Sequence, residues 1–245
     1  MLSLRLISVL GLVVLSLSVC YADPVSLTLA SANNYVSPDG GYVAPYMLQV
    51  TGTTQTFPVI CDDYTVDVAP GLSWTAQTFS LTNLGSPGDS TRFYGSSTFA
   101  NTNSATVAYD EAAWLAYQTG LFGGPAATNQ QISNLNYAIW YLFDSTGAHG
   151  LSTDPGYANN VNDINTLLGD AYSAVTTQPL PDYFSNVVIY TPTCNGQTPC
   201  DATTTPPNSQ EYIGFTTVPE PGSFALLATG IVGLVARKPL IKIRE

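Results

Sequence analysis

The spacing of apolar residues changes twice along the chain, and this change limits the fold more than any other feature. Residues 25–81 hold short stretches of alternating apolar and polar residues separated by Gly or Pro, the pattern of half-buried strands. From Thr106 to Val175 the apolar residues recur every three or four positions, as in amphipathic helices. Strand-like stretches return at 183–191 and 211–216. We therefore predict an antiparallel β framework with a helical insertion, an α+β fold that is mainly β.

The helical region contains three predicted helices. Thr128 and Gln131 form a capping box at the start of the second helix, and Gly120 follows the end of the first. We interpret Asp110 and Glu111 as charges near the N-terminus of the first helix, where acids are favourable. The predicted helices lie near residues 107–118, 129–146 and 160–175. The predicted strands are 25–29, 42–50, 55–60, 64–68, 74–81, 183–191 and 211–216.

Residues 1–22 have the composition of a cleaved signal peptide. Arg5 supplies the positive start, residues 6–19 are apolar and uncharged, and a small-x-small site ends at Ala22. We therefore expect export and cleavage by signal peptidase after Ala22. Cys20 raises the alternative of lipid attachment, but the residue before it is larger than the Gly, Ala or Ser expected in a lipoprotein.

Residues 218–245 are a second terminal segment, in which an apolar run lies between a Pro-Glu-Pro tripeptide and a basic end. The apolar run, 224–236, has 13 residues, fewer than the about 20 of an independent transmembrane helix. Four of the six Lys and Arg residues of the chain follow it, including Arg237 and Lys238, which favours a cytoplasmic C-terminus. An ordinary tail anchor is one interpretation of this weak stop-transfer segment.

The tripeptide Pro219-Glu220-Pro221 favours a second interpretation, because its two prolines hold the Glu in extended backbone where an enzyme can read it. The order of this tripeptide, the Leu- and Gly-rich run and Arg237-Lys238 resembles the PEP-CTERM sorting signal of Gram-negative bacteria. The resemblance implies that exosortase, a membrane enzyme, recognises the tripeptide and removes the tail. It also implies transient membrane anchoring and delivery to the cell surface and its exopolysaccharide, as in a biofilm matrix.

The stretch between the two terminal segments, 23–217, is long enough for one domain with its own core. Arg92 is its only Lys or Arg against fifteen Asp and Glu, which gives a formal charge of −14. This charge excludes nucleic acid binding by phosphate neutralisation. The many Ser, Thr, Asn, Gly and aromatic residues suit a surface that hydrogen-bonds to polysaccharides. A secreted β protein without a specific ligand is an equally simple interpretation.

Three cysteines remain after the predicted signal peptide. Cys194 and Cys200 bracket five turn-prone residues, so their Cα atoms can approach to about 6 Å, and we expect a local disulfide in an oxidising compartment. Cys61 is left unpaired at the end of a predicted strand, where inert packing in a β core is the first interpretation. Asn136 lies on the apolar stripe of the second helix, where its amide needs a partner such as the backbone of a neighbouring loop.

Residues 61–140 support another interpretation of this Cys and Asn. The order is a Cys followed by Asp and Tyr, a helix with Tyr and Ala-Trp-Leu, a Gly-rich loop, and a helix containing Ala138-Ile139-Trp140. This order resembles the thioester domains of Gram-positive surface adhesins. In that family a Cys thiolate attacks a Gln amide, expels ammonia and leaves a thioester that reacts with amines. The resemblance implies Cys61 and Asn136 as the pair. Asn136 stands where the family has Gln and is one methylene shorter, which moves its carbonyl carbon by about 1.5 Å.

No residue pattern points to an enzyme or to a bound metal or cofactor. His149 is the only histidine, so a His pair for zinc is absent and a Ser-His-Asp triad depends on that residue. Asp62, Asp63 and Asp67 lack the spacing of a calcium loop. We therefore predict a noncatalytic exported surface or matrix protein. The alternatives are a covalent adhesin that uses Cys61 and a secreted carbohydrate-active enzyme.

Overall fold

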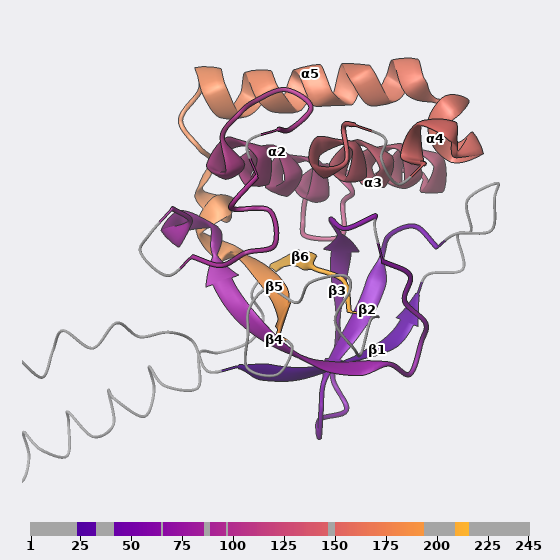
Figure 1. The fold of residues 1–245 in the computed structure, drawn as a ribbon, viewed down its shortest axis with the longest axis vertical. Coiled ribbons are helices and arrows are strands. Elements are labelled where there is room, and N and C mark those ends of the chain that lie inside the picture. The colour runs from indigo at the N-terminus through magenta and orange to yellow at the C-terminus, as the bar shows by residue number, and fades with distance from the viewer. Residues whose placement is uncertain are drawn as a thin grey trace, which may run out of the picture.

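The computed structural model describes residues 24–32, 42–64, 66–85, 89–96, 98–146, 150–193 and 209–215. They form one domain in which a small β-barrel carries a layer of helices (Figure 1). The predicted α+β fold, with antiparallel strands and a helical insertion, is confirmed. Among the described residues, no helix combines the length and apolar composition needed to cross a membrane. The predicted terminal segments 1–22 and 218–245 lie outside these residues.

Six antiparallel strands close the barrel in the order β1-β2-β3-β6-β5-β4. They are β1 (Val25–Ala32), β2 (Tyr46–Val50), β3 (Thr56–Cys61), β4 (Ser73–Ser80), β5 (Val187–Thr193) and β6 (Tyr212–Phe215). The first four strands precede the helices, and the last two follow them. Closure therefore depends on two pairings between distant parts of the chain, β3 with β6 and β4 with β5.

Alternation along the strands separates two cores on the two faces of the sheet. Leu27 on β1 is paired with Trp74 on β4 and is buried with it inside the barrel. On β3, Val59 and Cys61 also belong to the barrel interior, whereas Ile60 between them packs with the helices. The outer face of β3 and β6 is thus covered rather than solvated.

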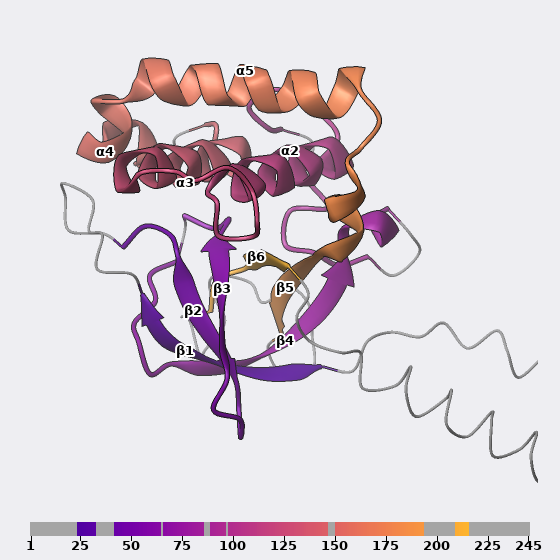
Figure 2. The same ribbon diagram turned by 180° about the vertical axis from the view of Figure 1, so that it is seen from behind.

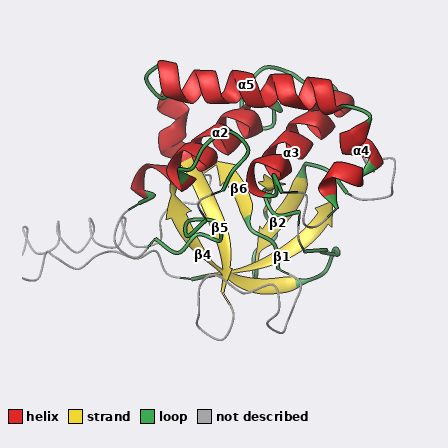
Figure 3. Ribbon diagram, turned by 45° about the horizontal axis from the view of Figure 1, so that its top comes forward, coloured by secondary structure: helices red, strands yellow, loops and turns green. Residues whose placement is uncertain are grey.

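The helical layer consists of two helices against the barrel and a third helix across them (Figures 1 and 2). Ser104 caps α2 (Ala105–Gln118), and Thr128 with Gln131 forms the predicted capping box of α3 (Asn129–Phe143). The short α4 (Pro155–Ala158) leads into α5 (Val161–Thr177). Viewed from above, α5 spans both α2 and α3 (Figure 3). The described part of the chain also contains three short 3₁₀ helices: η2 (Leu81–Asn83), η3 (Leu151–Thr153) and η4 (Asp182–Asn186).

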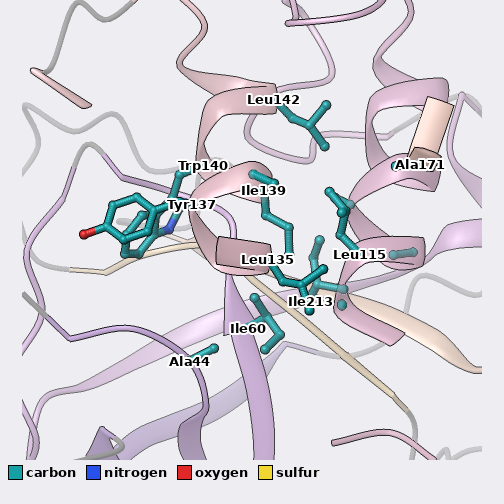
Figure 4. Close-up of a cluster of buried hydrophobic side chains, with 14 of the residues drawn as sticks. Ala44, Ile60, Leu115, Leu135, Tyr137, Ile139, Trp140, Leu142, Ala171 and Ile213 are labelled. Carbon is teal, nitrogen blue, oxygen red and sulfur yellow. The ribbon is translucent and has the colours of Figure 1, made fainter. Parts of the chain in front are cut away.

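A second core fills the space between these helices and the barrel (Figure 4). Leu135 and Ile139 of α3 and Leu115 of α2 meet Ile60 of β3 and Ile213 of β6, and all five are buried. Burial of side chains of this size contributes about 1.5–3 kcal/mol each before entropy is counted. The helices are therefore an integral cover of the barrel.

The predicted strand at 64–68 is wrong. The described residues there form a turn and loop, because the neighbouring β3 is already paired on both edges within a closed barrel. The ring of Tyr64 packs against Trp140, 5.2 Å between centroids, and its hydroxyl donates to Asp154. The carbonyl of Val66 accepts from the Gln210 side chain instead of from a strand.

Three other predicted elements exist, but their boundaries differ from the observed ones. The predicted strand 183–191 begins with η4, because Phe184 is buried in the core below the helices, and regular pairing starts at Val187. The predicted strand 42–50 pairs continuously only from Tyr46, and the helix predicted to reach residue 146 ends at Phe143.

Candidate functional site

The predicted pair Cys61 and Asn136 meets where the end of β3 lies under α3. Both residues are fully buried. The Asn136 Oδ1 accepts a hydrogen bond of 2.8 Å from the backbone N–H of Ala44, and its Nδ2 donates one of 3.0 Å to the backbone carbonyl of Cys61. The amide therefore joins α3 to β3 and to the chain that enters β2. Its partners are backbone groups, as the structural interpretation of Asn136 expects.

The thiol of Cys61, the one described cysteine, is free and is held by the backbone of Asp63. Its Sγ donates to the Asp63 carbonyl at 3.2 Å and accepts from the Asp63 N–H at 3.3 Å. Burial raises the pKa of this thiol well above its usual value, and the charge of Asp62 raises it further. A hydrogen bond from Trp140 acts in the opposite direction but is a smaller effect. Cys61 is therefore a thiol rather than a thiolate at neutral pH.

Asp62 and Asp63, which follow Cys61 in the chain, lie in a buried network of charged side chains. Arg92 forms an ion pair with Asp63 and donates from Nη2 to the Ser209 carbonyl at 3.1 Å. The backbone N–H of Arg92 donates to Glu211 Oε2 at 2.8 Å. Asp62, Asp63 and Glu211 are fully buried, and the side chain of Arg92 is 10% exposed. One cation thus lies among three carboxyl groups.

Glu211 is the centre of this network. Its Oε1 accepts from the hydroxyl of Tyr109 on α2, and its Oε2 accepts from the hydroxyl of Thr191 on β5. With the Arg92 backbone, three donors from three segments converge on one carboxylate. Glu211 immediately precedes β6, so the network fixes the start of that strand against β5, α2 and the 89–96 segment.

Sequence reasoning missed Arg92 and Glu211 as partners. Arg92 had one signal: a lone basic residue in a stretch with fifteen acids is a good candidate for a buried ion pair. No sequence signal indicated that Glu211 is buried. The alternating pattern around it does not show that helices cover the outward face of β6. The pairing of β3 with β6 determines this burial.

Asp110 and Glu111 are not charges at the N-terminus of a helix, and that interpretation is wrong. The first turn of α2 contains no acid, because the helix already begins at Ala105. Both side chains are buried, and burial raises the pKa of Asp110 to about 6 and that of Glu111 to about 7. Asn101 donates to Glu111 Oε2 at 2.9 Å and to the carbonyl of Leu168 on α5 at 3.1 Å. The two acids therefore lie within the helical layer.

The remaining predicted site residues fall into two groups. Asp67 is exposed and separate from the buried Asp62 and Asp63. Outside the described residues lie His149, the predicted disulfide Cys194–Cys200, the tripeptide Pro219-Glu220-Pro221 and the basic pair Arg237-Lys238.

Comparison with known families identifies the C-terminal segment. Residues 217–238 match the PEP-CTERM protein-sorting motif. The chain carries a PEP-CTERM sorting signal. This signal implies export, transient membrane anchoring at the C-terminus and processing by an exosortase-type membrane enzyme. It begins two residues after Phe215, the last residue of β6.

Comparison with solved structures finds bacterial surface domains. The chain is similar to the N-terminal thioester domain of the fibronectin-binding protein SfbI from Streptococcus pyogenes, with 13% identity and a TM-score of 0.40, over 77% of this chain and 100% of that one. It is also similar to the N-terminal domain of the Streptococcus pyogenes pilus tip adhesin Cpa, with 13% identity and a TM-score of 0.39, over 82% of this chain and 97% of that one. These neighbours include the class that residues 61–140 resemble in sequence. No curated protein matches the chain in sequence.

Proposed function

We propose that this PEP-CTERM protein is a noncatalytic protein of the cell surface or extracellular matrix of a Gram-negative bacterium. The observation that carries the proposal is the sorting motif at 217–238, which directly follows the last strand of the folded domain. In this proposal the tail holds the protein in the membrane until exosortase removes it. The barrel and its helices are then delivered as one folded unit.

The chemistry of the domain supports a noncovalent role among surface polymers such as exopolysaccharide. Its formal charge of −14 would repel anionic surfaces, so we expect neutral polymers as partners. Tyr42, Tyr94 and Tyr172 are exposed, and their rings combine an apolar body with a hydroxyl that can bond to sugars.

The covalent adhesin is a second candidate, because the fold brings Cys61 and Asn136 into contact. The contact uses the carbonyl of Cys61 and the nitrogen of Asn136, while the thiol bonds to Asp63. Both functions of the amide are also engaged by backbone groups. These bonds favour the noncovalent role. A carbohydrate-active enzyme would need accessible carboxylates, and the pair Asp110 and Glu111 is buried.

The experiment is the intact mass of the surface form recovered from fractionated cells, compared with a Glu220→Ala variant. We expect the wild-type mass to fit a chain that begins after Ala22 and lacks the tail, with no deficit of one ammonia. Glu220→Ala should keep the tail and stay with the membrane fraction. Asp170→Ala, an exposed acid on α5, is the matched control and should be processed normally.

Two results would count against the proposal. Normal release of Glu220→Ala would show that exosortase does not recognise the tripeptide. A deficit of one ammonia that disappears in Cys61→Ala would establish the covalent adhesin instead.

A further inference from the structure

The two acids Asp62 and Glu211 face each other across the seam that closes the barrel. In the register of β3 and β6, Ile60 pairs with Ile213 and Cys61 with Tyr212, which makes Asp62 and Glu211 the next opposed residues. The N–H of Asp62 donates to the carbonyl of Glu211 at 3.4 Å. Opposed residues of antiparallel strands have Cβ atoms about 4.5–5.5 Å apart. Because side chains alternate, both carboxyl groups lie on the same face as Ile60 and Ile213, toward the helices.

The hydrogen-bond donors around this pair are unequally shared. Glu211 accepts from Tyr109, Thr191 and the backbone of Arg92. Neither carboxyl oxygen of Asp62 has a conventional donor from another described residue. The described surroundings therefore supply three hydrogen-bond donors to Glu211 and none to a charged Asp62.

The one nearby cation does not compensate for a second charge. The guanidinium of Arg92 is ion-paired with Asp63, so ionising both Asp62 and Glu211 would place two further negative charges side by side in a buried site, and a proton on Asp62 removes one of them. An uncompensated buried charge costs several kcal/mol, and such a group takes up a proton instead. Two ionised carboxylates are both acceptors only, so they cannot form a hydrogen bond with each other.

We propose that Asp62 remains protonated in the folded protein and donates a hydrogen bond from its carboxyl O–H to a carboxyl oxygen of Glu211, which makes the pair a pH-sensitive lock between β3 and β6. Burial raises the pKa of Asp62, and Glu211 raises it further. Arg92 and the backbone N–H of Asp62 itself lower it, as smaller effects. The other titratable groups near the pair are Asp63, which is ion-paired with Arg92, Tyr109 from α2, Cys61 from β3 and Tyr212 from β6. Burial raises the pKa of the thiol and of both phenols, so these three groups are neutral at neutral pH.

The direction of the pH effect follows from the raised pKa. The stabilisation is complete below the pKa of an unfolded Asp, about 3.9, and is lost as the pH rises through the folded pKa of Asp62. Above that pH two carboxylates repel each other at the start of β6. Because β6 has only four residues and precedes the sorting motif, a pH above the folded pKa of Asp62 loosens the strand that connects the domain to its tail.

The first test is infrared spectroscopy of the whole protein at about pH 8, where Asp110, with a pKa of about 6, is ionised. The Glu111→Gln variant removes the other buried acid with a raised pKa near neutrality. We expect the carbonyl band of a protonated carboxylic acid in this variant. Absence of the band would overturn the proposal, whether or not any Asp62 variant folds.

The second test compares Asp62→Asn with Asp67→Asn, which makes the same substitution at an exposed position five residues away. In the Glu111→Gln background, we expect Asp62→Asn to lose the infrared band and its urea midpoint to fall less steeply with rising pH than that of Glu111→Gln alone. Asp67→Asn should keep both the band and the fall. Equal behaviour of the two variants would contradict the lock.

Discussion

Two buried polar sites lie side by side at the end of β3, and they are built in different ways. Asn136 is a neutral amide that bonds to two backbone groups, Ala44 and Cys61. The network around Glu211 is charged and draws on Arg92, Tyr109 and Thr191 from three segments. The first site holds one helix to the barrel, whereas the second holds the strand that closes the barrel.

The difference concerns what each site needs in order to be stable. The Asn136 amide uses one donor and one acceptor, and both are backbone groups, one at the end of β3 and one in the chain that enters β2. A set of buried carboxyl groups needs a cation, several donors and, for Asp62, a proton. The charged network is therefore more sensitive to the loss of a single member and to pH. The predictions below test this ranking.

The largest effect is expected from Arg92→Met. This change leaves Asp63 buried without its ion-pair partner, and removal of one member of a buried ion pair costs about 3–5 kcal/mol. The free energy of unfolding from urea denaturation measures it. The double variant Arg92→Met/Asp63→Asn should recover part of the loss, because no unpaired charge remains at position 63. Additive losses in the double variant would show that the two residues are not coupled.

An intermediate effect is expected from Asn136→Ala. The N–H of Ala44 and the carbonyl of Cys61 lose their shared partner, and each orphaned buried group costs about 1–3 kcal/mol. We expect a total loss of about 2–4 kcal/mol in urea denaturation. Asn134→Ala on the same helix is the control, because its partners Gln130 and Asp163 are both exposed to water and should limit the loss to below about 1 kcal/mol. Similar losses in both variants would contradict the role of Asn136.

The smallest of these effects is expected from Glu111→Gln in the helical layer. The folded pKa of Glu111, about 7, lies above its ordinary value of 4.5, so its stabilisation is complete at acidic pH and is lost between those two values. Wild-type stability should therefore fall from about pH 5 to pH 8, and the variant should lose about 2 kcal/mol of that fall.

Urea denaturation across this range measures the slope. Asp170→Asn on the exposed face of α5 is the control and should keep the wild-type slope. A Glu111→Gln slope equal to that of the wild type would show that burial of Glu111 does not control the pH dependence.

Local patterns predicted the helices better than the strands. The capping box at Thr128 and Gln131 placed the start of α3 correctly, because a cap depends on residues three positions apart. The segment 64–68 has the composition of a strand but lies in a loop, since the barrel offers it no free edge. Strand pairing depends on partners far away in the chain, which local alternation cannot supply.

The candidate site was predicted only in part, for the same reason. The stripe of α3 indicated that Asn136 is buried and needs a partner, and the structure supplies Ala44 and Cys61. The acids after Cys61 gave no indication of Arg92 or Glu211. Arg92 and Glu211 are 119 positions apart and meet only because β6 returns to pair with β3.

The sequence by itself determined the sorting signal, the acidic charge, the order of strands and helices and the burial of Asn136. Each of these depends on composition or on residues a few positions apart. Only the tertiary structure decided that the barrel closes through β3 and β6, that the thiol of Cys61 bonds to Asp63, and that Asp62 faces Glu211. These outcomes depend on long-range pairing, because a buried carboxyl group is stable only when distant segments supply its donors, its cation or its proton.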